Sequence, residues 1–200
     1  MRSFRHEVER LREYEDVVDI SEIARRLFAM NSFDGILTIL GVLVGNYLAE
    51  VRVPQVIIVT GLATSVSMGV SGLWGAYLTE SAERQKSLDD LGELTLTDLT
   101  NTRIGRASRA AVVIVALVDG MAPLLASVLV LMPFFLAGAL GDITYSYYLA
   151  LAIAMVGLFG LGMFLGRISR QSTLLAGLKM IVAGVVAVVL SYLIESAIPG

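Results

Sequence analysis

The chain has 200 residues, of which 56% are hydrophobic and 16% charged, and its mean hydropathy is +0.77. Soluble domains average about half apolar and a quarter charged residues, so this composition predicts an integral membrane protein. The net charge of −3 gives no indication of a nucleic-acid partner. With no cysteine and a single histidine, His6, disulfides, thiolate metal sites, multi-histidine zinc sites and His-based catalytic triads are excluded.

Residues 1–30 are rich in both charge signs and carry no early apolar run, so no signal peptide is expected. Leu11, Tyr14 and Val18 give this arm a weak apolar face, which predicts an amphipathic cytoplasmic helix. A second short helix from Glu22 to Met30 is expected to lead into the membrane. The remainder, 31–200, is predicted to be the membrane domain.

Five apolar segments follow, each long enough to cross about 30 Å of hydrocarbon at about 1.5 Å per residue. The fold class predicted is therefore an all-α polytopic membrane protein in which short connections join antiparallel neighbours. The spans are expected near 33–49, 54–79, 109–135, 145–166 and 174–195.

The distribution of positive charge predicts the orientation in the cell membrane. If the N-terminus is cytoplasmic, all 15 Lys and Arg residues lie on the inside except Arg52 and Lys179. Cytoplasmic connections carry an excess of Lys and Arg, so the N-terminus is expected inside and the C-terminus outside.

The first span carries an ionisable residue, Asp34, in an otherwise apolar run. A carboxylate is costly in hydrocarbon, so such a residue is expected to face a bundle interior and to mark a pathway or a proton relay. Thr38, Gly41 and Gly45 follow at helical spacing on the same face. The alternative for the glycines is close helix packing, which does not account for the Asp.

The second span places Thr64, Met68, Ser71 and Gly75 on one face. Hydroxyl groups with one thioether suit the path of a cation. The alternatives are small-residue helix packing for the glycine and gap filling for the methionine.

The longest polar connection, 80–108, is predicted to be an acidic cytoplasmic loop. Glu80 and Glu83 are three residues apart, so on a helical extension of the second span they share a face and can hold a divalent cation. The alternative is a solvated loop in which Arg84 and Lys86 balance the acids.

Two further charges, Asp119 and Lys179, fall inside the third and fifth spans at comparable depth. A buried ion pair would lower the cost of both charges, so structural pairing is expected, with a direct role in a pathway as the alternative.

Several motifs, taken together and in order, resemble the vacuolar iron and manganese transporters in a small prokaryotic form. The similarity covers roughly 22–197. It rests on Phe-Asp-Gly-Ile-Leu-Thr-Ile-Leu-Gly-Val-Leu-Val-Gly at 33–45, Ser-Met-Gly at 67–69, Leu-Met-Pro-Phe at 131–134, Leu-Lys-Met at 178–180 and Ser-Tyr-Leu-Ile at 191–194. Gly72 or Ala76 stands where that family often has a Glu, and 80–108 is too short for the larger cytoplasmic three-helix unit of that family.

The resemblance implies a homodimer of five-helix protomers with an ion path between first and second spans at the two-fold axis. It implies proton-coupled export of Fe²⁺ or Mn²⁺ as cargo, with no cofactor. Asp34 and Met68 would be the intramembrane metal contacts, and Glu80 and Glu83 the cytoplasmic capture residues. The alternatives are an exporter of a small organic cation or amino acid, and a non-transporting membrane assembly protein. No nucleophile–base pair or phosphate loop indicates an enzyme.

Overall fold

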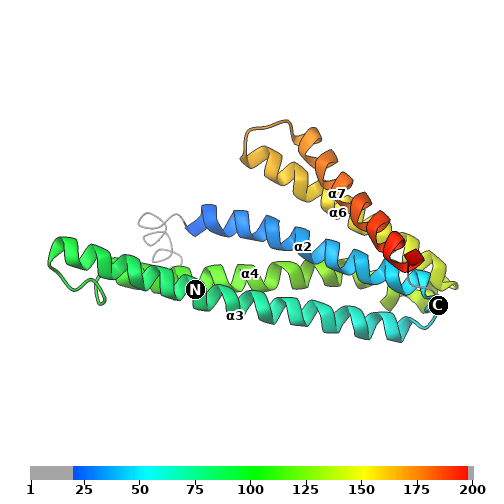
Figure 1. The fold of residues 1–200 in the computed structure, drawn as a ribbon, viewed down its shortest axis with the longest axis horizontal. Coiled ribbons are helices and arrows are strands. Elements are labelled where there is room, and N and C mark those ends of the chain that lie inside the picture. Colours follow the sequence, from blue (N-terminus) through cyan, green and yellow to red (C-terminus); the bar gives the residue numbers. More distant parts are fainter. Residues whose placement is uncertain (1–19, 198–200) are drawn as a thin grey trace, which may run out of the picture. The chain divides into compact units, whose positions relative to one another are not determined.

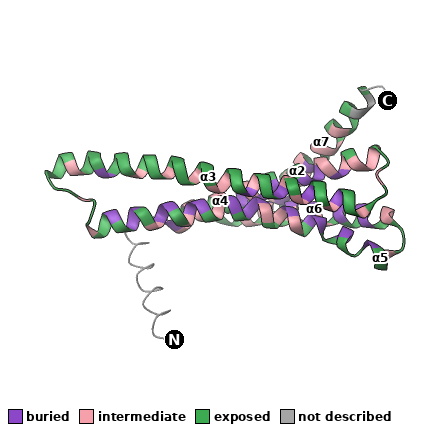
Figure 2. Cartoon of the chain, turned by 90° about the horizontal axis from the view of Figure 1, so that it is seen from below, coloured by how far each residue is buried: buried purple, intermediate pink, exposed green. Residues whose placement is uncertain are grey.

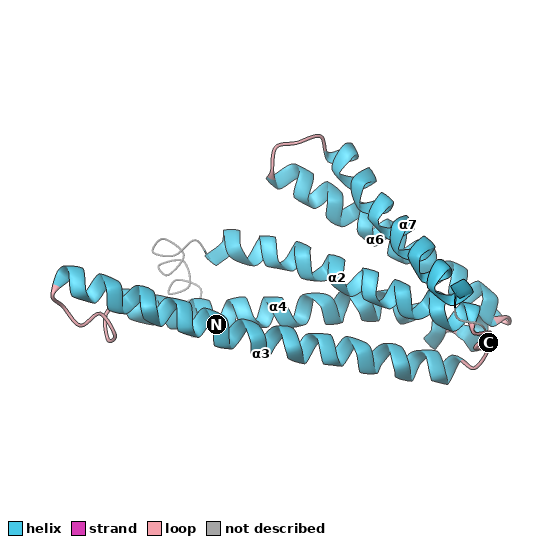
Figure 3. Ribbon diagram, viewed as in Figure 1, coloured by secondary structure: helices cyan, strands magenta, loops and turns pink. Residues whose placement is uncertain are grey.

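The computed structural model describes residues 20–197, and every regular element in this part of the chain is a helix (Figures 1 and 3). Five helices are long and apolar enough to cross a membrane, as the composition predicted. The N-terminal amphipathic helix predicted within 1–19 lies outside the described residues. The elements are α2 (Ile20–Leu48), α3 (Pro54–Thr95), α4 (Arg103–Phe135), the short α5 (Ala137–Leu140), α6 (Ile143–Ile168) and α7 (Thr173–Ala197).

Three helices, α2, α3 and α4, extend beyond the bounds expected from the sequence. The short helix expected at 22–30 is not separate, because α2 runs without a break from Ile20 to Leu48. The predicted loop 80–108 is largely helical, since α3 continues to Thr95 and α4 already begins at Arg103. The polar composition of 80–95 suggested a loop, but ion pairs and amide hydrogen bonds at i,i+4 spacing stabilise an exposed helix.

The chain divides into two compact units, and the division falls within α2, α3 and α4. Of the described residues, the first unit comprises 20–28 and 70–121, and the second comprises 29–69 and 122–197.

In the first unit, α3 and α4 form an antiparallel hairpin around a turn at 96–102 (Figure 3). The turn is held by Arg109, whose Nη1 donates to the carbonyl of Thr100 at 3.0 Å, and by Asp98, whose Oδ1 accepts from the Thr100 N–H at 2.9 Å. A side chain at Gly105 would collide with the backbone of Leu99 and Thr100, so a glycine is needed where α4 passes the turn.

The core of the second unit gathers large apolar side chains from α2, α3, α4 and α6. Buried residues are drawn purple in Figure 2. Along α6 the buried positions follow a four-residue period of mostly small side chains, which lets neighbouring backbones approach closely. That stripe consists of Ser146, Ala150, Ala154, Leu158, Gly162 and Gly166.

Helix α7 packs on this stripe through glycines. A Cβ at Gly162 would lie 2.5 Å from the carbonyl oxygen of Ala176, and a Cβ at Gly177 would lie 2.5 Å from the ring of Phe159. These distances are shorter than any real Cβ contact, so the α6–α7 hairpin depends on the missing side chains.

Three helices end in the Schellman pattern with a residue other than glycine in the left-handed conformation. These residues are Glu50 after α2, Leu96 after α3 and Arg170 after α6, with φ of 55°, 52° and 55°. After α3, for example, the N–H of Thr97 donates to the carbonyl of Gly92 at 3.1 Å. Each turn satisfies carbonyls that the helix end leaves free, at the cost of a conformation that favours glycine.

Candidate functional site

Asp34 lies on α2 in the second unit and is exposed on the surface of the single chain. Whether it faces the interior of a bundle formed with a second copy stays a prediction, but within one chain it points outward. The reason lies in the helical period, because α2 buries Ile36, Ile39, Leu40 and Leu43. At about 100° per residue, those side chains point to the side of the helix opposite Asp34.

The residues of the polar stripe predicted on α2, namely Asp34, Thr38, Gly41 and Gly45, lie on one face of the helix. Thr38, one turn after Asp34, is exposed, and so is Gly45. A Cβ added at Gly45 would meet nothing within 4 Å, whereas one at Gly41 would lie 3.9 Å from the hydroxyl of Ser191 on α7. The stripe thus presents a carboxylate, a hydroxyl and an open backbone position on the outside of the protomer.

The backbone next to Asp34 is fixed against α4. A Cβ at Gly35 would stand 2.5 Å from the carbonyl oxygen of Pro123, so the two helices touch through their backbones at this point. The buried hydroxyl of Ser127 donates to the carbonyls of Pro123 and Gly35, at 2.6 and 3.2 Å. This contact holds the α2 segment that carries Asp34. Ser127 was not predicted, because a serine within a span commonly bonds the carbonyl four residues before it and its contact with α2 is not visible in the sequence.

On α3, Thr64 and Met68 are partly buried in the second unit, and Ser71 is exposed in the first. The Thr64 hydroxyl donates to the carbonyl of Thr60 at 2.9 Å, which leaves its lone pairs for another ligand. The thioether of Met68 belongs to the same unit as Asp34. Whether these side chains share a metal stays a prediction.

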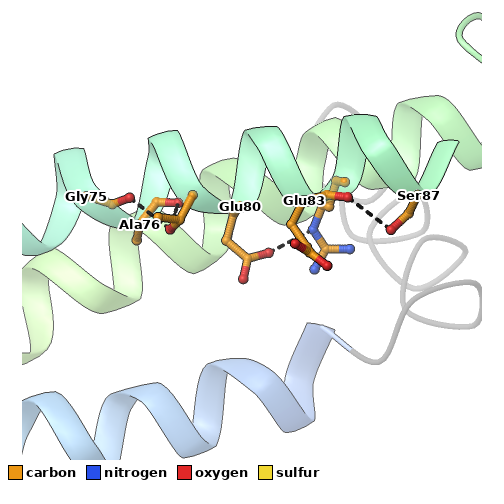
Figure 4. Close-up of polar contacts among 7 residues, drawn as sticks. Gly75, Ala76, Glu80, Glu83 and Ser87 are labelled. Carbon is orange, nitrogen blue, oxygen red and sulfur yellow. Dashed lines mark hydrogen bonds and ion pairs between the residues drawn. The ribbon is translucent and has the colours of Figure 1, made fainter. Parts of the chain in front are cut away.

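Glu80 and Glu83 lie on the extension of α3 in the first unit, where both side chains project from the same side of the helix (Figure 4). The carboxylate of Glu80 accepts from Nε of Arg84 at 3.0 Å, in a pair whose side chains are 27% and 13% exposed. Glu83 is exposed. Within 20–197, no three His, Cys, Asp or Glu side chains gather closely enough to hold a metal.

Asp119 lies on α4 in the first unit, partly buried beside α3. A Cβ at Gly72 would come within 2.8 Å of the Asp119 carbonyl oxygen and 3.3 Å of its Oδ2. Gly72 is therefore the position that allows α3 to pass this carboxylate. Lys179 is exposed on α7 in the second unit, and its pairing with Asp119 stays a prediction.

A cluster of side chains around Arg52, in the second unit, was not predicted. Arg52, between α2 and α3, lies over the ring of Tyr47, with 5.8 Å from its guanidinium carbon to the ring centroid. Its Nη1 donates to the hydroxyl of Thr144 at 3.4 Å. The hydroxyl of the buried Tyr147 donates to the carbonyl of Val51 at 2.9 Å. The signal in the sequence was Arg52 itself, which stands apart from the other basic residues.

The chain resembles an archaeal protein over most of its length. The chain is 31% identical over 179 residues to the uncharacterized protein MJ0645 of Methanocaldococcus jannaschii, and the match covers 88% of this chain and 91% of the relative. No family model matches the chain. No solved structure matches it either.

Proposed function

The chain belongs to the same family as the uncharacterized protein of Methanocaldococcus jannaschii, and we propose that it carries divalent metal ions across the membrane. Fe²⁺ or Mn²⁺ is the proposed cargo, exported from the cytoplasm in exchange for protons. The observation that carries the proposal is Asp34, an acidic residue within a helix long and apolar enough to span the bilayer. A residue of this kind is costly to keep and is usually tied to a function.

The exposure of Asp34 supports a pathway between two copies of the chain. A carboxylate facing lipid in the hydrocarbon region is unfavourable, and a second copy would remove it from lipid. The α2 stripe fits such an interface, because Gly45 is open and Thr38 adds a hydroxyl. Small and polar residues of this kind promote close helix association in membranes. The homodimer is therefore part of the proposal.

The chemistry of the proposed path follows from its donor atoms. Asp34 would lose its proton when the cation arrives and regain one from the far side. Met68 would add a soft sulfur ligand, which favours Fe²⁺ and Mn²⁺ over Mg²⁺ and Ca²⁺. A dimer would double the single-chain set of one carboxylate and one thioether. Glu83, exposed beside the Glu80–Arg84 pair, would attract cations toward the path from the cytoplasm.

Metal flux in proteoliposomes tests this proposal. Wild type is expected to move Fe²⁺ and Mn²⁺ under an imposed pH gradient. Asp34→Asn should reduce this flux at least about tenfold, the effect of losing about 1.4 kcal/mol of interaction. Met68→Ala should reduce discrimination against Mg²⁺ and Ca²⁺.

Matched controls are Asp89→Asn on the α3 extension and Met132→Ala on α4, both exposed. They should leave the flux unchanged. Wild-type flux that survives both Asp34→Asn and Met68→Ala would remove the site assignment. Flux of organic cations or amino acids in place of metals would replace the proposed cargo.

A further inference from the structure

An apolar cleft of about 430 Å³ lies in the second unit between α2, α6 and α7. Binding sites for small molecules span about 300–1,000 Å³, so the cleft is large enough for an organic group. Its walls are aliphatic and tyrosine side chains, and no lining residue is charged. They include Leu43, Val44, Leu151, Val189, Tyr148 and Tyr192.

A second hollow of about 560 Å³ lies in the same unit, beside the connections that precede α3 and α6, and both polar and apolar residues line it. Arg52 and Asp142 supply its charges, and Gly138 and Gly141 leave its wall without side chains. A pocket with one fixed cation and one fixed carboxylate is complementary to a ligand that carries both signs of charge.

Arg52 and Tyr47 place the two hollows next to each other. Tyr47 lines the apolar cleft, Arg52 lines the polar pocket, and the guanidinium lies 5.8 Å from the Tyr47 ring centroid. Besides its contact with the Tyr47 ring, Arg52 uses one donor in a 3.4 Å hydrogen bond to Thr144, and its other N–H groups can donate to an anion. An apolar cleft beside a pocket that carries charges matches an amphiphile.

Both charges of the pocket are present at neutral pH. Hydrogen bonds from the backbone and hydroxyl of Thr144 hold the pKa of Asp142 below its usual value, and the charge of Arg52 lowers it further. The guanidinium is always protonated in proteins.

We propose that the two hollows together bind one phospholipid with an amine in its headgroup. The acyl chain fills the apolar cleft, the phosphate binds Arg52 and the ammonium group binds Asp142. A lipid suits this position because the cleft lies between helices long and apolar enough to span the bilayer, where acyl chains surround the protein. The site is independent of the proposed metal transport.

Native mass spectrometry of the full chain, titrated with lipids of identical acyl chains, tests this site. We expect one phosphatidylethanolamine per protomer. Phosphatidylcholine, whose amine has no N–H to donate, and phosphatidylglycerol, which has no amine, should bind about tenfold more weakly. Arg52→Gln should weaken phosphatidylethanolamine binding about tenfold. Asp142→Asn keeps a helix cap and should abolish the preference over phosphatidylcholine.

A variant that fills the cleft tests the acyl-chain position. Val189→Trp should block lipid binding, while Val185→Trp, one turn earlier on α7 and outside the cleft, should not. Arg167→Gln removes a positive charge at the other end of α6 and is the control for the loss of charge in Arg52→Gln.

Three results would overturn the proposal. The first is equal binding of all three lipids to wild type. The second is undiminished lipid binding to Arg52→Gln together with an unchanged lipid preference in Asp142→Asn. The third is that Val189→Trp loses the dimer and keeps the lipid. The last would mean that a second copy of the chain fills the cleft. Unfolding midpoints measured on each variant identify a change that acts through folding.

Discussion

Asp34 places a carboxylate on the exposed side of the apolar helix α2. Its presence in an apolar run was sufficient to predict that it matters, because the cost of a carboxylate in hydrocarbon does not depend on the fold. The expectation that it faces a bundle interior stays a prediction, since that bundle includes the proposed second copy of the chain. The spacing of Ile36, Ile39 and Leu43 places them on the side of α2 opposite Asp34, and all three are buried in the structure.

Asp142 provides a pH-dependent prediction. As the N-cap of α6 it accepts the N–H of Thr144 at 2.8 Å, which lowers its pKa below the unfolded value of 3.8. The cap therefore contributes its full stability above about pH 4 and loses it as the pH falls through the folded-state pKa. Asp142→Asn keeps a capping oxygen but does not titrate.

The measurement is the thermal midpoint of wild type and Asp142→Asn in detergent between pH 7 and pH 2.5. The advantage of wild type over the variant should shrink on acidification. An advantage that stays constant across this range would contradict the assignment of the cap.

Leu96 provides a second prediction at the residue scale. It follows the last residue of α3 with φ of 52° and is 93% exposed, so its side chain stabilises little. Leu96→Gly should raise stability by about 1 kcal/mol, because glycine adopts this conformation without strain. Leu94→Gly, at an equally exposed but helical position, should lower stability by about 1 kcal/mol. A loss of stability in both variants would refute the left-handed cap.

Among the elements, the five apolar helices could be predicted because length and hydropathy are properties of each segment alone. The extension of α3 could not, because its sequence is polar and a helix there depends on local pairs. Arg84 with Glu80, and Gln85 with Asp89 at 2.9 Å, are such i,i+4 pairs. The contacts between helices could not be predicted from the sequence either. Gly35, Gly72 and Gly162 look like any other glycine until the neighbour that each one faces is known.

The α6–α7 hairpin yields the prediction at this scale. Gly162→Ala places a Cβ 2.5 Å from the carbonyl oxygen of Ala176, a backbone atom that cannot move aside within its helix. The variant should therefore lower the free energy of unfolding by about 1–3 kcal/mol. Gly160→Ala, two residues away with nothing within 4 Å, should be neutral or stabilise by up to about 1 kcal/mol. Thermal unfolding of the two variants in the same detergent is the comparison. Equal effects would mean that the hairpin does not depend on this backbone contact.

For the whole molecule, the proposed dimer gives an accessible prediction because the chain has no cysteine. Single cysteines at Thr38 and Gly45 lie on the exposed α2 stripe and should form disulfide-linked dimers on mild oxidation in membranes. Val156→Cys, 72% exposed on α6, is the control and should remain monomeric. Crosslinking through Val156 but not through the α2 stripe would place the interface elsewhere.

The central claim is that Asp34 exchanges a proton for a passing metal ion. Simultaneous recording of Mn²⁺ uptake and internal pH in proteoliposomes tests it most directly, with wild type and Asp34→Asn compared at equal protein density. Wild type is expected to move Mn²⁺ and protons in opposite directions, and Asp34→Asn is expected to lose both fluxes. Mn²⁺ uptake by Asp34→Asn at the wild-type rate, with unchanged proton movement, would contradict it.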